Sequence, residues 1–222
     1  MNDAPDSLRA VLHEQAIALP NAQVDLLERY CALLWEWNAK INLTRHTDYH
    51  KFVARDLVDS LAFAEFLGQG ERVLDVGSGG GVPGVVLAIV RPDLKITLAE
   101  SVGKRARALD DVVEKLGLPL PVCHVRAERY LADHHFDTLV IRAVARLKKL
   151  LEWFKPHWSQ FDRMLLIKGP SWPEERGEAR HFGLFRALSL RKLKVYPLPA
   201  GGVESVVLEI RRNHDGSGDT SS

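Results

Sequence analysis

Residues 72–84 read Arg-Val-Leu-Asp-Val-Gly-Ser-Gly-Gly-Gly-Val-Pro-Gly, and this stretch decides the fold. Its first five residues form a short apolar run, which is typical of a buried strand. The glycines that follow permit positive φ angles and let the backbone pass close to a ligand. Ligands of open α/β sheets bind at the carboxyl ends of the strands. The stretch therefore predicts a strand, a ligand-binding turn and then a helix.

The rest of the chain divides around this stretch. Before it, apolar residues recur at helical spacing over most of residues 1–66, with a break at Pro20-Asn21. After it, we expect strands at 72–76, 95–100, 122–126, 136–142, 164–168, 190–196 and 205–211, and helices at 84–90, 104–116, 146–158 and 174–181. This alternation predicts a mostly parallel sheet with helices on both faces. The last two strands have no helix between them, so they predict an antiparallel terminal hairpin.

We accordingly expect three parts: a helical N-terminal extension at 1–66, an α/β domain at 67–212 and a disordered tail at 213–222. The tail has no apolar residue that could contribute to a core. The first eleven residues lack the apolar segment of a signal peptide. No run of 18 apolar residues occurs, so no membrane span is expected.

Charge and cysteine content limit the possible functions. The chain of 222 residues has a formal net charge of +1, so any basic surface for a nucleic acid must be local. Its two cysteines, Cys31 and Cys123, lie far apart and outside any Cys-x-x-Cys pair, which argues against a disulfide framework or a zinc site. We expect a cytoplasmic monomer without a metal ion.

The glycine turn is compatible with two kinds of ligand. Gly79-x-Gly81-x-x-Gly84 satisfies the dinucleotide fingerprint, which alone is weakly specific. Asp75 stands two residues before the first glycine, an arrangement typical of S-adenosylmethionine-dependent methyltransferases. Glu100 ends the second strand, where a carboxylate can accept hydrogen bonds from ribose hydroxyls. We favour S-adenosylmethionine and a Rossmann-like class I methyltransferase sheet; another nucleotide, a turn without a ligand and a solvated Glu100 stay as alternatives.

Basic residues gather in three groups, which are Lys40, Arg45, Lys51 and Arg55; Arg142, Arg146, Lys148 and Lys149; and Arg186, Arg191, Lys192 and Lys194. The first two groups could frame the ligand cleft and hold RNA phosphates, largely without regard to sequence. A solvated face is the alternative for each group. Trp35 and Trp37 could stack on a base, but Trp35 continues an apolar helical face and is expected in the core.

Several segments together match one protein family. They are Trp35-x-Trp37-Asn38-x-x-x-Asn42-Leu43-Thr44, Asp59-Ser60-Leu61, the stretch from Leu74 to Gly84, Glu100-Ser101 with Lys104-Arg105, Arg126-Ala127-Glu128, Arg142-Ala143 and Lys168-Gly169. Over residues 30–212, the chain resembles the glucose-inhibited division protein B family of small-subunit rRNA guanine-N7 methyltransferases. The glycine turn with its Val-Pro-Gly ending and the tryptophan–asparagine segment are the most specific markers.

The resemblance implies where the cofactor binds. Gly77 and Val82 would contact S-adenosylmethionine, and Gly79 belongs to the same turn. Ala127 and Glu128, which follow the third strand, would bracket the adenine. From the residues alone, Glu128 could equally be a surface acid.

The resemblance also implies a substrate, a guanine in small-subunit (16S-type) ribosomal RNA, either free or in the small ribosomal subunit. Arg142 would lie between cofactor and substrate, and Lys168 would contact RNA; both are catalytic candidates. Arg55 and Lys148, from the basic groups, are the other expected RNA contacts. A structural salt bridge from Arg142 to an acid such as Glu128 is the alternative.

Two positions depart from the family pattern. Members commonly have Arg-His before the Asp-Ser-Leu segment, whereas this chain has Arg55-Asp56. An acid there would weaken a phosphate contact, so we assign Asp56 no role. The residue before Arg142 is often Ser, and here it is Ile141.

The residues agree with chemistry at guanine N7. This atom has a lone pair and no proton, so methyl transfer needs alignment and no general base. The fourth strand ends in Ile141-Arg142-Ala143 and lacks the Pro-Pro-Tyr/Phe segment of exocyclic-amine methyltransferases. We expect Arg142 to orient the target through guanine O6, a phosphate or the cofactor carboxylate. The competing functions are methylation of a protein or small molecule and non-catalytic binding of RNA or NAD.

Overall fold

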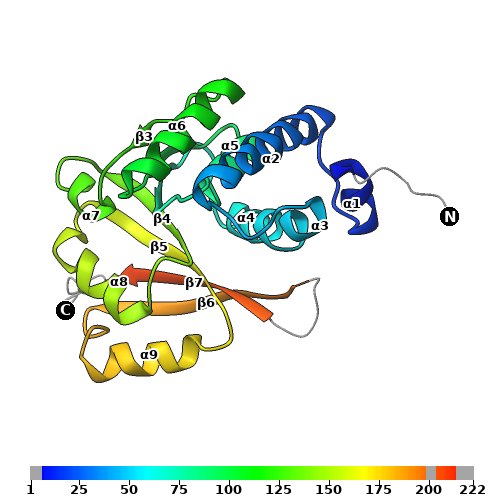
Figure 1. Cartoon of the computed structure of the whole chain (residues 1–222). Helices are drawn as coiled ribbons and strands as arrows, with labels where there is room; N and C mark the ends of the chain where they lie inside the picture. Colours follow the sequence, from blue (N-terminus) through cyan, green and yellow to red (C-terminus); the bar gives the residue numbers. More distant parts are fainter. Residues whose placement is uncertain (1–6, 199–203, 214–222) are drawn as a thin grey trace.

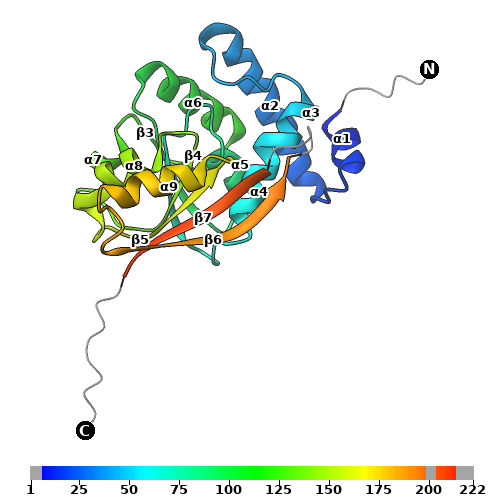
Figure 2. The same cartoon turned by 90° about the horizontal axis from the view of Figure 1, so that it is seen from below.

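The computed structural model describes residues 7–198 and 204–213. Within them, the strands form one sheet in the order β3-β2-β1-β4-β5-β7-β6. The strands are β1 (Arg72–Val76), β2 (Lys95–Ala99), β3 (Val122–Cys123), β4 (Phe136–Arg142), β5 (Phe161–Lys168), β6 (Leu188–Pro197) and β7 (Glu204–Arg212). The neighbouring pairs from β3 to β5 are parallel, and β7 runs antiparallel to both β5 and β6. Figure 2 shows β5, β7 and β6 side by side. The predicted fold class is confirmed.

The helices precede, separate and cover these strands. The N-terminal ones are α1 (Leu8–Glu14), α2 (Asn21–Ile41), α3 (Tyr49–Lys51), the π-helical segment η1 (Phe52–Leu57) and α4 (Val58–Ala64). Those among the strands are α5 (Gly84–Val90), α6 (Gly103–Leu116), α7 (Ala127–Tyr130), α8 (Leu147–Phe154), the 3-10 turn η2 (Lys155–His157) and α9 (Trp172–His181).

The sheet separates two hydrophobic cores. Successive residues of a strand point to opposite faces, so Val140 of β4 joins one core while Leu139 and Ile141 join the other. The first core is shared with α1, α2, α4, α5 and α6, and the second with α8 and α9. Figure 1 shows α2 and α4 on one side of the sheet and α8 and α9 on the other. The N-terminal helices therefore complete a face of the sheet.

Hydrogen bonds also attach the long helix α2 to the sheet region. The indole Nε1 of Trp37 donates to Asp111 Oδ2 of α6 at 2.7 Å. The buried Tyr30 hydroxyl donates to the Gly80 carbonyl of the glycine turn at 2.9 Å. These bonds position α2 directly over the turn that was expected to bind a ligand.

The structure differs from the expectation at three elements. The helical region expected up to residue 66 contains the π-helical segment η1, which side-chain periodicity does not reveal. The third strand is shorter than expected: only Val122 and Cys123 pair with β2, at the sheet edge. The one-turn helix α7 was not expected, since four residues are too short to show a helical period. The hairpin loop 199–203 and the expected tail, apart from Asn213, lie outside the described residues.

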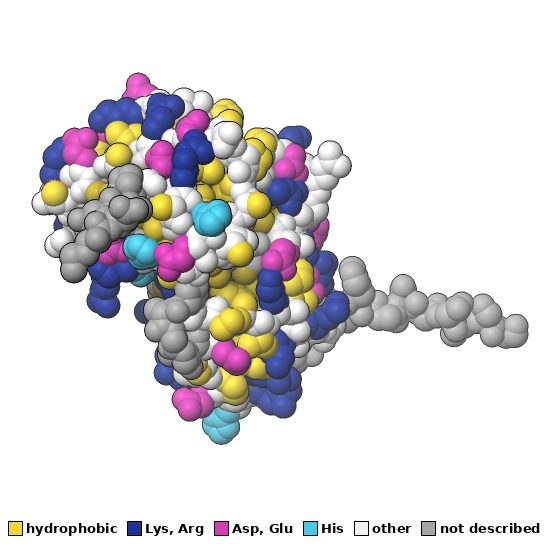
Figure 3. Space-filling view, turned by 90° about the vertical axis from the view of Figure 1, so that its right-hand side faces the viewer, with side chains coloured by type: hydrophobic (Ala, Val, Ile, Leu, Met, Phe, Trp, Pro, Cys, Tyr) yellow, Lys and Arg dark blue, Asp and Glu magenta, His cyan; other side chains and the backbone are white. Residues whose placement is uncertain are grey.

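Charged side chains are distributed over the surface in keeping with the small net charge. On the face in Figure 3, Lys and Arg side chains alternate with Asp and Glu and surround apolar side chains. In the part of the chain that the structure describes, no helix is long and apolar enough to cross a bilayer.

Two glycines allow a test of how tightly the turn packs. A Cβ on Gly84 would lie 2.2 Å from Leu98 Cδ2 and 2.6 Å from Asp75 Oδ2. We expect Gly84→Ala to lower the free energy of unfolding by about 3 kcal/mol, since overpacking forces the backbone to move. The measurement is urea unfolding followed by circular dichroism.

Gly177→Ala is the matched control, because Gly177 lies in α9 with open space around its Cα. Alanine is the better helix former there, so we expect unchanged stability or a gain of up to about 1 kcal/mol. Equal effects of the two substitutions would show that the turn is not closely packed.

Candidate functional site

The glycine turn adopts the backbone conformations that its sequence predicts. Gly77, Gly79 and Gly81 have φ angles of 70°, 56° and 105°, which side chains disfavour. A Cβ on Gly77 would also lie 3.0 Å from Val144 Cγ2. The backbone between β1 and α5 is therefore bare and close to the end of β4, as a ligand-binding turn requires.

Glu100 follows β2, and its carboxylate is fixed beneath the turn. The residue is 3% exposed. Its Oε2 accepts a hydrogen bond from the Gly79 N–H at 2.9 Å, and its Oε1 accepts one from the Val102 N–H at 2.7 Å. Each carboxylate oxygen has two lone pairs. The carboxylate can thus anchor the turn and still accept a bond from a ligand hydroxyl.

A cavity of about 90 Å³ opens beside the glycine turn. It is lined by Val76, Gly77, Ala99, Ser101, Val125, Arg126, Ala127, Glu128, Val144 and Trp153. Three of the predicted cofactor residues, Gly77, Ala127 and Glu128, therefore lie in one cavity wall. The Glu128 carboxylate has a distant ion-pair partner, Arg126 Nη1 at 3.8 Å.

The other predicted cofactor residues lie around this cavity. Gly79 and Glu100 bond to each other next to it. Val82 is half-buried and packs into the first core, at the far end of the turn. Gly77 and Gly79 thus lie at or next to the cavity, whereas Val82 packs against the first core and does not line it.

Sequence reasoning missed Val144 and Trp153. Val144 lies just after β4, beyond Ala143, a residue with a φ of 55°. Such a conformation in a residue with a side chain is strained and is common at functional sites. Trp153 reaches the cavity from α8. A tryptophan in an amphipathic helix is a visible signal, but its orientation depends on how the helix packs.

Asp75 of β1 is buried directly below the turn. It is 1% exposed, and its Oδ2 accepts the Gly84 N–H at 3.0 Å. Its Oδ1 has no hydrogen-bond partner among the described residues. Burial raises the pKa of Asp75 to about 7, although the Gly84 bond and the charge of Arg142 oppose this change. The carboxyl group is thus poised to respond to a positively charged ligand group.

Arg142, at the end of β4, is held by two carboxylates from the N-terminal helices. Its Nη2 donates to Asp56 Oδ1 at 2.7 Å, and its Nε donates to Asp59 Oδ2 at 2.8 Å. The guanidinium side chain is 13% exposed. Burial opposes its charge, but the two carboxylates outweigh burial and raise the pKa of Arg142 above its ordinary value. Arg142 therefore forms ion pairs, as the structural alternative supposed, but its partners are Asp56 and Asp59 and not Glu128 or Asp137.

A second layer of contacts surrounds these carboxylates. The Tyr196 hydroxyl donates to Asp59 Oδ1 at 2.6 Å, and burial followed by the Asp59 charge raises the pKa of Tyr196. Arg55 Nε lies 3.4 Å from Asp59 Oδ2, while Arg55 Nη1 donates to Ser205 Oγ at 3.0 Å. Arg55, an expected RNA contact, is thus anchored to β7 and keeps a third of its side chain exposed.

The other two expected RNA contacts also interact within the protein. Lys168 Nζ donates to the Ala145 carbonyl at 2.6 Å and to Glu175 Oε2 at 2.8 Å, and its side chain is 12% exposed. Lys148 Nζ lies 3.4 Å from the ring centroid of Phe182. Lys168 is therefore placed at the end of β5 near the site, and Lys148 faces α9.

The tryptophan–asparagine segment shapes the chain between α2 and α3. Asn38 Oδ1 accepts the N–H groups of Leu43 and Thr44 at 2.6 and 2.8 Å. Asn42 ends α2 with a φ of 51°. Trp35 is half-buried, and its Nε1 donates to the His46 carbonyl at 2.8 Å. These residues therefore hold the segment that carries His46.

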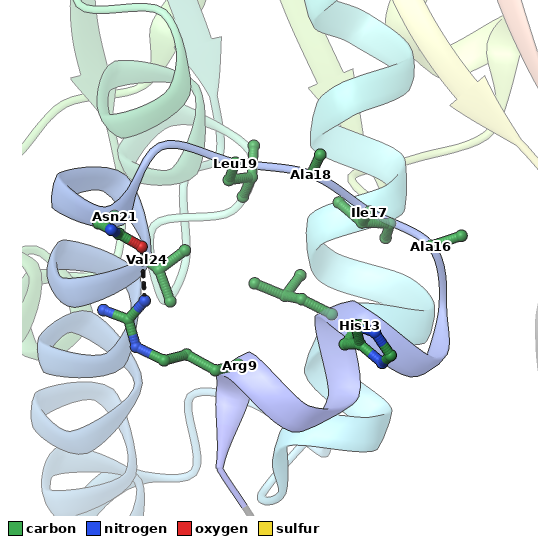
Figure 4. Close-up of a pocket in the computed structure, with 9 residues that line it drawn as sticks. Arg9, His13, Ala16, Ile17, Ala18, Leu19, Asn21 and Val24 are labelled. Atoms are coloured by element: carbon green, nitrogen blue, oxygen red, sulfur yellow. Dashed lines mark hydrogen bonds between the residues drawn. The ribbon is translucent and has the colours of Figure 1, made fainter.

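A larger cavity, about 490 Å³, lies between α1 and α2 (Figure 4). Apolar side chains such as Ile17, Leu19 and Val24 make up most of its lining. At its edge, Arg9 Nη1 of α1 donates a hydrogen bond to Asn21 Oδ1 of α2 at 2.8 Å. It includes no residue of the glycine turn. The small cavity beside Gly77, despite its size, is therefore the candidate site.

Comparison with known sequences identifies similar proteins. The GidB family model, described as rRNA small subunit methyltransferase G, matches residues 23–196. The ribosomal RNA small subunit methyltransferase G of Rhodopirellula baltica is 56% identical over 172 residues, which are 78% of this chain and 74% of that protein. The protein of the same name from Chromobacterium violaceum is 39% identical over 163 residues, 73% of this chain and 78% of that protein.

Solved structures share the fold at low sequence identity. M. capricolum TrmK in complex with S-adenosyl-homocysteine has a TM-score of 0.56 and 14% identity, covering 70% of this chain and 68% of that chain. A point mutant of MtNAS in complex with S-adenosylmethionine has a TM-score of 0.55 and 17% identity, covering 95% and 86%. The 23S rRNA methyltransferase ErmE has a TM-score of 0.52 and 16% identity, covering 72% and 69%.

The raised pKa of Asp75 predicts a specific pH dependence of stability. Above about pH 4 the unfolded chain releases this proton, whereas the folded protein keeps it until about pH 7. The stabilising contribution of the protonated form is therefore lost as the pH rises through this window, by on the order of 4 kcal/mol at most.

Asp75→Asn cannot ionise and should lack this loss. In urea unfolding at pH 5 and pH 8, the wild type should lose more stability than Asp75→Asn does. The asparagine itself adds only an offset that does not depend on pH. If the difference in free energy of unfolding between the two proteins were the same at pH 5 and pH 8, Asp75 would already be ionised at pH 5.

Proposed function

Since the chain belongs to the rRNA small subunit methyltransferase G family, we propose that it transfers a methyl group from S-adenosylmethionine to N7 of a guanine in small-subunit ribosomal RNA. The observation that carries this proposal is one cavity at the carboxyl ends of β1, β2 and β4. Gly77, Ala127 and Glu128 line it, and Glu100 lies beside it. Arg142 ends β4, the strand next to β1.

The residues around the cavity fit this cofactor. About 90 Å³ is small beside the roughly 300–1,000 Å³ of most sites for larger ligands. We infer that the cavity holds the adenine, between Ala127 and Trp153, and that Glu100 accepts the ribose hydroxyls. The bare backbone at Gly77 leaves space for the methionine part. Asp75, with an unpaired Oδ1 among the described residues, stands under the turn, where a positively charged cofactor would favour its ionised form.

The bound cofactor would supply an electrophilic methyl group. Guanine N7 attacks with a lone pair and loses no proton, so the protein does not need a general base at this atom. Its contribution is to align N7 with the methyl carbon and to exclude water. Such alignment can reduce the barrier by several kcal/mol, up to roughly 7–11 in ideal cases.

We assign this alignment mainly to Arg142. Two of its five N–H groups bond to Asp56 and Asp59, and three stay available for guanine O6, a phosphate or the cofactor carboxylate. We propose that Lys168 acts beside it, at the end of β5. Arg55 and Lys148 are the proposed phosphate contacts.

We further propose that the chain acts as a monomer in the cytoplasm, on ribosomal RNA or on the small ribosomal subunit. Its own basic groups support contact with RNA. On the face in Figure 3, Lys and Arg side chains are mixed with Asp and Glu, so any such contact would be local. Phosphate contacts of this kind make binding weaken as the salt concentration rises.

Methyl transfer is tested directly with labelled S-adenosylmethionine. Small ribosomal subunits, or their naked RNA, are taken from cells that lack this gene, with large subunits as control. We expect label in 7-methylguanosine from the small-subunit RNA alone. Label in another nucleoside or only in protein would overturn the proposal, and tight binding of NAD in place of S-adenosylmethionine would remove the cofactor assignment.

The proposed role of Arg142 is tested by Arg142→Ala. We expect kcat for methyl transfer to fall by about 100-fold, because the target loses its alignment, while the Kd of S-adenosylmethionine changes by less than about threefold. Arg9→Ala removes an exposed arginine that pairs with Asp25 and serves as control. Normal turnover of a folded Arg142→Ala protein would leave the ion pair as a purely structural feature.

A further inference from the structure

We propose that Asp56 is a positioning residue for methyl transfer, and that together with Asp59 it clamps the Arg142 guanidinium in its working orientation. The inference rests on the proposed function and extends the active site into the N-terminal helices. It also gives a role to a position for which the sequence suggested none.

Two carboxylates hold the Arg142 guanidinium, each at a different nitrogen. Asp56 bonds to Nη2 and Asp59 to Nε, at 2.7 and 2.8 Å. The remaining oxygens of the two carboxylates differ. The Tyr196 hydroxyl bonds to Asp59 Oδ1, whereas Asp56 Oδ2 lies 2.9 Å from His46 Nδ1 as an ion-pair contact and has no hydrogen-bond partner among the described residues. Rotation of either carboxylate would therefore lose its bond to Arg142 together with this second contact.

Burial of the two carboxylates makes the loss of their contacts to Arg142 energetically costly. Asp56 is 2% exposed and Asp59 is fully buried. A buried carboxylate without a partner is costly, so both acids favour the state in which Arg142 lies between them. Because two directed bonds come from different sides, the guanidinium plane is fixed, and its three free N–H groups have a defined direction.

The local backbone supports the same conclusion from a separate observation. Asp56 lies in η1, a π-helical segment in which each hydrogen bond spans one residue more than in an α-helix. Such segments are rare and are frequent at functional sites. The wider turn coexists with a 2.8 Å bond from Ser60 Oγ to the Asp56 carbonyl. Asp56 and Asp59 thus reach one guanidinium from consecutive turns.

An acid suits this place better than a histidine would for holding Arg142. A protonated imidazole would repel the guanidinium, and a neutral one offers a single acceptor without charge. In this chain, the imidazole instead comes from His46, which approaches the outer oxygen of Asp56. His46 belongs to the segment held by Asn38 and Trp35, so that the tryptophan–asparagine motif supports the clamp from outside.

The first experiment replaces Asp56 with Asn, which keeps the size of the side chain and removes its charge. We expect kcat on small subunits to fall by roughly 10-fold or more, because the guanidinium becomes mobile. The Kd of S-adenosylmethionine and the KM for subunits should change by less than about twofold. Asp93→Asn, which breaks the exposed pair with Arg91, should leave kcat unchanged.

The second experiment separates positioning from folding by introducing Asp56→Asn into the Arg142→Ala protein. If Asp56 acts through Arg142, the double variant should be no slower than Arg142→Ala, and it should melt at a higher temperature because an unpaired buried charge is gone. A further 10-fold fall in kcat in the double variant would overturn the proposal, as would normal kcat for Asp56→Asn.

Two controls keep the result interpretable. If Asp56→Asn does not fold, Asp56→Glu is used in the same comparison; its longer side chain keeps the charge but displaces the guanidinium, so kcat should again fall only when Arg142 is present. If the wild type itself does not label small-subunit RNA, the proposed function fails, and this outcome is distinct from failure of the clamp.

Discussion

The structure depends on one buried ion-pair cluster, in which Arg142 of β4 meets Asp56 and Asp59 of the N-terminal helices. Without this pairing, two carboxylates and a guanidinium would be buried without compensation, and breaking such a pair by removing one partner typically costs about 3–5 kcal/mol. The cluster therefore imposes a single arrangement of the helices on the sheet. Apolar side chains of α2 and α4 pack into the first core, and the directed bonds of the cluster add a fixed register to this packing.

A second constraint acts at the turn between β1 and α5. The turn is rich in glycine, and its backbone at Gly77 and Gly84 lies against Val144, Leu98 and Asp75. Such a turn is expensive in conformational entropy, and below it stands an acid whose pKa is raised by burial. Local strain at Ala143 lies beside the same cavity. Backbone strain and buried charge are common where a ligand must approach closely, and here they lie around the small cavity beside Gly77.

The described side chains around Arg142 are organised for alignment and not for proton transfer. The charged groups there are paired with one another: Arg142 with Asp56 and Asp59, and Lys168 with Glu175. Such pairing makes side chains rigid, and rigid donors are what a reaction at an unprotonated nitrogen needs. The N-terminal helices thus belong to the reaction centre as well as to the core of the protein.

Sequence alone determined the order of strands and helices, the terminal hairpin and the position of the ligand-binding turn, because these depend on local patterns of apolar residues and glycines. The position of Glu100 after the second strand indicated a ligand contact, and the family resemblance of the sequence implied Gly77, Ala127 and Glu128. Only the tertiary structure decided the partners of Arg142, the place of Trp153 in the cavity wall and the role of Asp56. Asp56 and Arg142 are 86 residues apart in the chain, and no local periodicity relates two side chains that meet only when helices pack on a sheet.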